Sequence, residues 1–124
     1  MWVSRRTAGF ALASCHALIF LVVAGFVVHW SSDAQWQLGW LVFLKVDFPV
    51  SLVTIPLFLW CPQVSLPWVP YPYSELKGFI LPTLIYGILG TFWYYMLPFV
   101  LFFLVRKLRR ITEVIKVKFL DGKH

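Results

Sequence analysis

Three long apolar runs constrain the fold of this chain more than any other feature of its sequence. They cover residues 8–30, 36–61 and 78–105, and short connections join them. The first and third runs contain no Lys, Arg, Asp or Glu. An α-helix rises about 1.5 Å per residue, so each run is long enough to cover a hydrocarbon core of about 30 Å. The runs therefore predict helices that lie in a membrane.

The composition supports the same class of protein. Of the 124 residues, 60% are hydrophobic and 13% are charged, whereas soluble domains average about 45–50% apolar and about 25% charged residues. A soluble domain of this size would have too little polar surface to cover itself. We expect an all-α integral membrane protein, with a transmembrane bundle over residues 1–105 and a basic juxtamembrane tail over residues 106–124. The bundle would hold about three hydrophobic helices.

The first run is preceded by Arg5 and Arg6, which is also typical of a signal peptide. A signal peptide has an apolar core of about 7–15 residues and a small-residue cleavage site. This run is longer, and no clean A-x-A site follows it. We interpret it as a retained transmembrane anchor.

The second run contains a charge pair and a proline in the sequence FLKVDFPVS. A charge at the centre of a membrane helix costs about 2.5–3.5 kcal/mol on insertion scales. Lys45 and Asp47 are two residues apart, so they point to different sides of a regular helix and cannot easily pair. We expect Asp47 to cap a new helix that starts at Phe48, with Pro49 in its first turn, and Lys45 to reach toward headgroups. The run would then be a short segment, Trp36–Val46, followed by a helix from about Phe48 to Trp60.

A broken helix at membrane depth is tolerated only against protein or a wet cavity. In transporters such breaks often hold substrate or ion sites, whereas in other proteins they are structural kinks. A polar residue of the first run, His16, also needs a partner or a cavity. Lys45, Asp47 and His16 are therefore the candidate intramembrane polar site, and both readings of the break stay open.

Small residues recur at helical spacing in the first and third runs. Such residues let two helix backbones approach closely in lipid, so they predict faces that meet each other or a partner chain. The candidate packing residues are Gly9, Ala13, Ala17 and Gly25 in the first run, and Thr83, Gly87 and Thr91 in the third. The third run, about 28 residues long, contains Pro82 and Pro98, and a span of this length must tilt, kink or protrude from the hydrocarbon core.

The tail carries most of the net charge. Residues 106–124 hold seven Lys or Arg against two acidic residues, a sum of +5 of the +6 total. Basic residues beside a membrane span attract anionic headgroups, and we expect Arg106, Lys107, Arg109 and Arg110 to bind them. The residues at helical spacing, which predict an amphipathic helix along the membrane surface, are Leu108, Ile111, Ile115 and Phe119. We do not expect nucleic acid as a partner, because apart from Phe119 nothing in the tail could stack on bases.

The basic residues leave two topologies open. Lys- and Arg-rich segments stay in the cytoplasm, so Arg106–Arg110 predicts a cytoplasmic C-terminus. Three crossings would then place Arg5 and Arg6 outside. If the second run instead enters and leaves the same face, both basic ends would be cytoplasmic.

No catalytic or metal-binding pattern is present in the sequence, and we expect neither enzymatic activity nor a cofactor. The first hypothesis is a small multi-pass subunit, in the plasma or inner membrane, that packs into a homo-oligomer or a larger membrane complex. The alternative is an oligomeric ion- or proton-conducting component that uses Asp47 and Lys45 at the broken helix.

Overall fold

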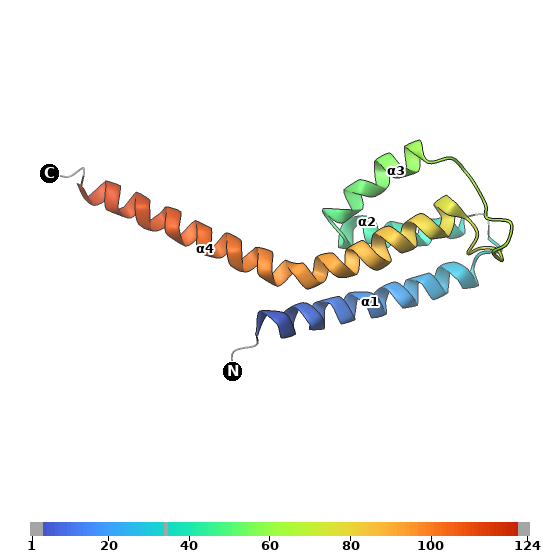
Figure 1. Ribbon diagram of the computed structural model, residues 1–124, viewed down its shortest axis with the longest axis horizontal. Helices are drawn as coiled ribbons and strands as arrows, with labels where there is room; N and C mark the ends of the chain where they lie inside the picture. Colours follow the sequence, from blue (N-terminus) through green and yellow to red (C-terminus); the bar gives the residue numbers. More distant parts are fainter. Residues whose placement is uncertain (1–3, 34, 122–124) are drawn as a thin grey trace.

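The computed structural model describes residues 4–33 and 35–121, and in these residues all regular secondary structure is helical. Two long helical segments lie side by side, and a shorter, broken segment covers part of them (Figure 1). The elements are α1 (Arg5–His29), the 3₁₀ helix η1 (Trp36–Leu41), α2 (Val42–Val46), the 3₁₀ helix η2 (Val50–Val53), α3 (Thr54–Trp60), the π-helices η3 (Leu76–Ile80) and η4 (Thr83–Gly90), and α4 (Thr91–Asp121).

Helix α1 coincides closely with the first apolar run. The Ser4 hydroxyl caps it by accepting a 3.2 Å hydrogen bond from the backbone N–H of Thr7, as a serine at this position commonly does. The helix ends at His29, just before Trp30 and two serines. Its 25 residues correspond to about 37 Å of helix.

The third run is helical throughout, and both of its prolines, Pro82 and Pro98, lie within the helical structure. Around Pro82 the helix is wound more widely, and the N–H of Ile80 donates to the carbonyl of Glu75 five residues earlier. Wider turns of this kind re-satisfy backbone groups near a proline in apolar surroundings. Pro98 lies inside α4, and the ribbon bends away from α1 along this part of its length (Figure 1).

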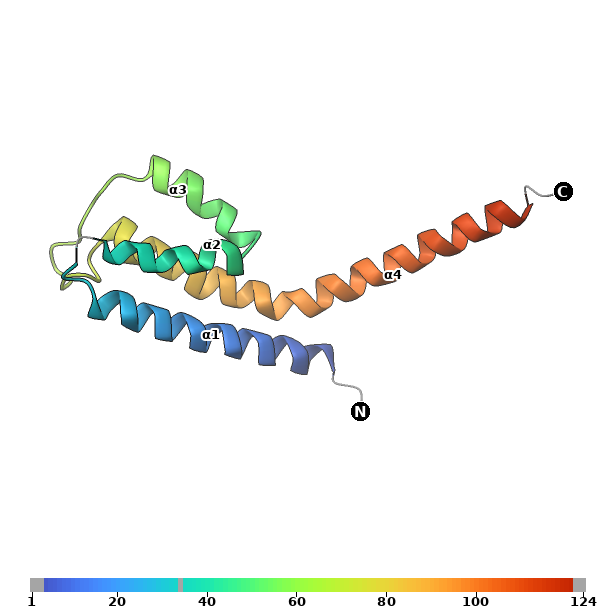
Figure 2. The same cartoon turned by 180° about the vertical axis from the view of Figure 1, so that it is seen from behind.

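The basic tail is helical and continues the third run, as its residues at helical spacing predicted. Helix α4 runs from Thr91 to Asp121 without a break, so residues 106–121 simply extend the third run beyond the bundle (Figure 2). The end of the predicted tail, residues 122–124, lies outside the described residues. Where the side chains of the tail are described, at residues 106–113 and 115, they are exposed.

The second run is broken where the sequence predicted. Segment Trp36–Val46 ends at Asp47, and a second segment, Val50–Trp60, follows a short turn. The two segments double back, so that the run starts and finishes toward the same end of the molecule (Figures 1 and 2). The turn lies beside His16, near the middle of α1.

Helix α1 runs antiparallel to η4 and α4 and packs against them through small residues (Figure 1). A Cβ atom on Gly9 would lie 2.6 Å from the backbone oxygen of Tyr95, and one on Gly87 would lie 2.8 Å from the ring of Phe20. A larger side chain at position 9 would push the helices apart because it meets backbone, whereas one at position 87 would force the ring of Phe20 to move.

An aromatic core joins the broken run to the two long helices. Its buried members are Phe20, Val27, Trp36, Trp40, Phe43, Ile85 and Tyr86. The rings of Phe43 and Tyr86 are stacked 5.3 Å apart, and the indole N–H of Trp40 donates to the carbonyl of Gly78 at 2.8 Å. The hydrogen bond satisfies the polar end of a tryptophan that is otherwise surrounded by apolar atoms.

Two helical segments, Arg5–His29 and Leu76–Glu113, are long and apolar enough to cross a membrane by length and composition. Core helices of soluble proteins also pass this test. Here, however, only 11% and 6% of their most apolar stretches are buried within the chain. Most of their apolar surface therefore faces outward.

Candidate functional site

A buried polar cluster lies at the turn of the second run. The imidazole Nε2 of His16 and the carboxylate Oδ1 of Asp47 are 2.8 Å apart. Asp47 has no exposed surface, and His16 is 3% exposed. The other imidazole nitrogen, Nδ1, lies 3.0 Å from the hydroxyl oxygen of Thr91. The histidine thereby connects the second run to α4.

Tyr94 and Gly90 complete the cluster from α4 and η4. The Tyr94 ring stacks on the imidazole at 4.7 Å, and its hydroxyl donates a 2.7 Å hydrogen bond to the carbonyl of Val46. A Cβ atom on Gly90 would lie 2.5 Å from Asp47 Oδ2 and 3.0 Å from the His16 ring. Glycine is thus needed at position 90 for the carboxylate to enter.

Local structure explains how these residues meet. Asp47 directly follows Val46, the last residue of α2, and its N–H still donates to the carbonyl of Phe43. The backbone then turns, and the N–H of Ser51 donates to the carbonyl of Asp47. The turn points the carboxylate toward α1, where His16 belongs to the same buried stripe as Gly9 and Phe20.

The prediction that Asp47 caps the following helix is wrong. No side-chain cap is present at the start of η2, and the carboxylate of Asp47 contacts His16 instead. A buried carboxylate is stabilised more by a hydrogen bond to an ionisable partner than by one from a backbone N–H group. The backbone N–H groups here can instead form the hydrogen bonds of a 3₁₀ turn. Pro49 does precede the first residue of η2, in agreement with the expected position near a helix start.

Of the three candidate polar residues, the structure brings together Asp47 and His16 but not Lys45. Lys45 is exposed in the last turn of α2. The two charges of the second run therefore face different surroundings, as their spacing predicted.

Most of the candidate packing residues lie in contacts within the chain, and one does not. Gly9 and Gly87 contact the opposite helix, Ala13, Ala17 and Thr83 are partly buried, and Thr91 bonds His16. Gly25 is exposed, and a Cβ atom there would have nothing within 4 Å. It takes no part in packing within the chain.

The basic residues of the two ends of the chain lie toward the same end of the molecule. The Arg5 guanidinium sits 3.4 Å from the centre of the Phe102 ring, four residues before Arg106 in α4. The expected headgroup-binding residues Arg106, Lys107, Arg109 and Arg110 are all exposed on the part of α4 that extends past α1 (Figure 1).

Sequence reasoning missed the roles of Tyr94 and Gly90. Tyr94 belongs to the Trp93-Tyr94-Tyr95 triplet, which could equally have marked an interface with water, and nothing local distinguishes Gly90 from other helix glycines. The sequence does contain a signal for the contact between His16 and Asp47, because they are the polar residues nearest the middle of their runs.

The cluster links the second run, α1 and α4 through contacts between polar groups. Its ionisable atoms are enclosed, and Asp47 Oδ2 has no hydrogen-bond partner among the described residues. Among the described residues there is also no group of three or more His, Cys, Asp or Glu side chains that could hold a metal ion.

Comparison with known proteins adds no relative. No family model, no curated protein and no solved structure matches this chain.

Proposed function

We propose that the protein is a small multi-pass membrane protein that works by helix packing, as a subunit of a homo-oligomer or of a larger membrane complex. The observation that carries the proposal is the contrast between the inside and the outside of the bundle. The ionisable groups near mid-length, His16 and Asp47, are enclosed by their own chain, while the surfaces of the two long helices are mostly apolar and exposed.

The proposed placement has α1 and Leu76–Glu113 crossing the bilayer as a hairpin. The second run enters from the far side, turns at Asp47 and returns to that side. This arrangement would put Arg5, Arg6 and the basic part of α4 together on the cytoplasmic face of a plasma or inner membrane, in agreement with the tendency of basic segments to remain there. The exposed Arg106 and its basic neighbours would then contact anionic headgroups.

The outer face of α1 supports a packing role. On a helix with 3.6 residues per turn, Gly25 lies together with Leu18 and Val22 opposite the buried stripe that contains Gly9 and Phe20. All three are exposed. A glycine on an outward face of a membrane helix permits close approach of another helix.

The alternative, an ion- or proton-conducting component, receives less support. A conduit requires that water reach its ionisable groups, yet Asp47 is fully enclosed and Lys45 lies elsewhere on the surface. The unpaired Asp47 Oδ2 is the one observation that favours it. Proton flux into liposomes that is lost in Asp47→Asn would support conduction over packing.

The test of the packing proposal is assembly of the full chain in lipid nanodiscs or mild detergent, measured by crosslinking and native mass spectrometry. Gly25→Leu should fold normally, because its surroundings are open, but should reduce the oligomeric or complexed fraction. Leu59→Phe, which adds bulk to the exposed surface of α3, is the control and should assemble normally. A wild-type chain that is monomeric and without partners, or a Gly25→Leu variant that assembles fully, would contradict the proposal.

A further inference from the structure

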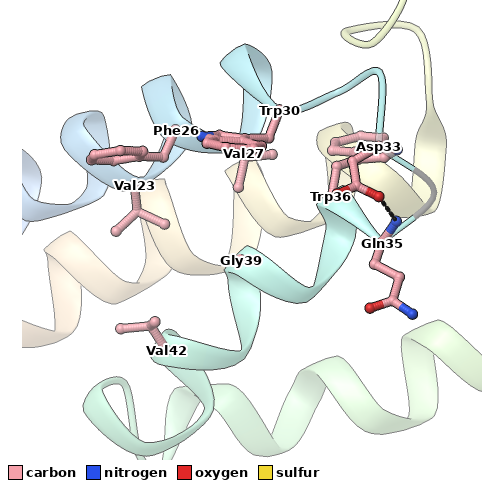
Figure 3. A pocket seen from close by; sticks show the side chains of 9 residues that line it. All are labelled: Val23, Phe26, Val27, Trp30, Asp33, Gln35, Trp36, Gly39 and Val42. Atoms are coloured by element: carbon pink, nitrogen blue, oxygen red, sulfur yellow. Dashed lines mark hydrogen bonds between the residues drawn. The ribbon is translucent and has the colours of Figure 1, made fainter.

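An apolar groove lies between α1 and the first half of the second run. Its volume is about 380 Å³, within the range of about 300–1,000 Å³ that is usual for small-molecule sites. Val23, Phe26 and Val27 form the α1 side, and Gly39 and Val42 form the opposite side (Figure 3). The groove exists because Gly39 lets the segments approach: a Cβ atom there would lie 2.6 Å from a methyl carbon of Val27.

The two ends of the groove differ in chemistry. Val23 and Val42 lie at one end, and Asp33 and Gln35 lie at the other, beside Trp36 (Figure 3). Asp33 is exposed, and its carboxylate accepts a 3.4 Å hydrogen bond from the backbone N–H of Gln35. Among the described side chains, no Lys or Arg pairs with this carboxylate.

Trp30 and Trp36 add aromatic surface to the groove, and the ring of Trp36 lies beside Asp33 (Figure 3). Both line the groove, and tryptophan is the aromatic residue that attracts cations most strongly. A carboxylate with two indole rings is a combination that favours an ammonium group. It disfavours a phosphate or a carboxylate that is not accompanied by a positive charge.

We propose that this groove binds one phospholipid with an ammonium headgroup. One acyl chain would lie along Val23, Phe26 and Val42, and the ammonium group would lie against Asp33 and the two tryptophan rings. The inference rests on the membrane placement proposed above but not on oligomer formation. The end of the bundle that holds Asp33 would then prefer lipids with an ammonium group, whereas the basic end would bind anionic headgroups.

The experiment uses the full chain in nanodiscs that contain phosphatidylethanolamine and phosphatidylglycerol. One lipid at a time carries a photoreactive diazirine on an acyl chain, and labelling of the protein is quantified by mass spectrometry. The phosphatidylethanolamine probe should label the groove segments more strongly than the phosphatidylglycerol probe does.

Two pairs of variants locate the site. Val42→Trp should fill the groove and reduce its labelling at least about threefold, whereas Val22→Trp, on an exposed part of α1 outside the groove, should not. Asp33→Asn should reduce the preference for phosphatidylethanolamine about two- to fivefold, the size of an exposed cation–π or ion-pair contact. Glu75→Gln is the matched control, because Glu75 lies outside the groove and its carboxylate accepts from Gln63 and Ser65.

Equal labelling by the two probes, or a preference that survives Asp33→Asn, would overturn the proposed headgroup selection. Unchanged labelling in Val42→Trp would overturn the groove as the site. Labelling of α4 and of the first half of α1, without labelling of residues 23–27 or 39–42, would leave the membrane placement intact and reject the groove alone. A protein that no acyl-chain probe labels would contradict the membrane placement as well.

Discussion

Helix α1 and the second run are about equally long and apolar, yet they fold differently. Helix α1 is continuous over 25 residues and satisfies its backbone within itself. The second run consists of four short helical pieces around a turn at Asp47, and its polar groups bond to other elements, as Asp47 does to His16. An apolar run can therefore be broken inside a bundle when a partner helix supplies hydrogen-bonding groups for the polar atoms at the break.

The largest expected effect comes from removing one member of the buried pair. His16→Leu or Asp47→Leu should each lower the free energy of unfolding by about 3–5 kcal/mol, because an enclosed ionisable group then loses its partner. The measurement is reversible unfolding in mixed micelles. If either variant unfolds like the wild type, the pair does not hold the turn against α1.

The double variant sharpens this prediction. His16→Leu combined with Asp47→Leu should lose less than the sum of the single losses, since neither ionisable group is left enclosed without the other. Lys45→Leu is the matched control from the same run and should change stability little, because its side chain is exposed. Additive single losses would indicate that the two residues act independently.

The next largest effect is expected from filling the space that Gly90 leaves beside Asp47. Gly90→Ala should lower the free energy of unfolding by about 1–3 kcal/mol, because its methyl group would lie 2.5 Å from Asp47 Oδ2. Gly25→Ala should instead be neutral or stabilising by up to about 1 kcal/mol, since it is exposed in a helix with nothing nearby. Equal effects at the two glycines would contradict the position of the carboxylate beside η4.

The smallest effect concerns the contact that ties the end of α2 to α4. Tyr94→Phe removes the 2.7 Å hydrogen bond to the Val46 carbonyl but keeps the ring that stacks on His16. Hydrogen bonds between membrane helices contribute about 0.6 kcal/mol on average and at most about 1.7 kcal/mol. The loss of stability should fall in this range, against no loss in Tyr95→Phe, and a loss as large as that of Asp47→Leu would show that the tyrosine does more than hold the carbonyl.

The sequence predicted the helical segments more accurately than the contacts between them. Run lengths located α1 and the long third helix, and Lys45, Asp47 and Pro49 located the break in the second run. Local rules assigned Asp47 to a helix cap, but its partner, His16, is 31 residues away. Such a contact depends on how the segments pack, which no local spacing records.

The prolines of the third run illustrate the same limit. Pro82 and Pro98 are helix breakers by local propensity, yet both lie inside continuous helical structure. In apolar surroundings, stopping a helix would leave several backbone groups without partners. Widening or bending the helix costs less.

The central claim is that the second run turns back at Asp47 and does not cross the membrane. It is tested most directly by single cysteines at Ser32 and Gln63, on either side of this run, and at Lys107 in the basic part of α4, with Cys15 and Cys61 replaced by Ala. Sealed vesicles of known orientation are treated with a membrane-impermeant maleimide. The account predicts that positions 32 and 63 react from the same side and position 107 from the opposite side. Reaction of positions 32 and 63 from opposite sides would contradict it.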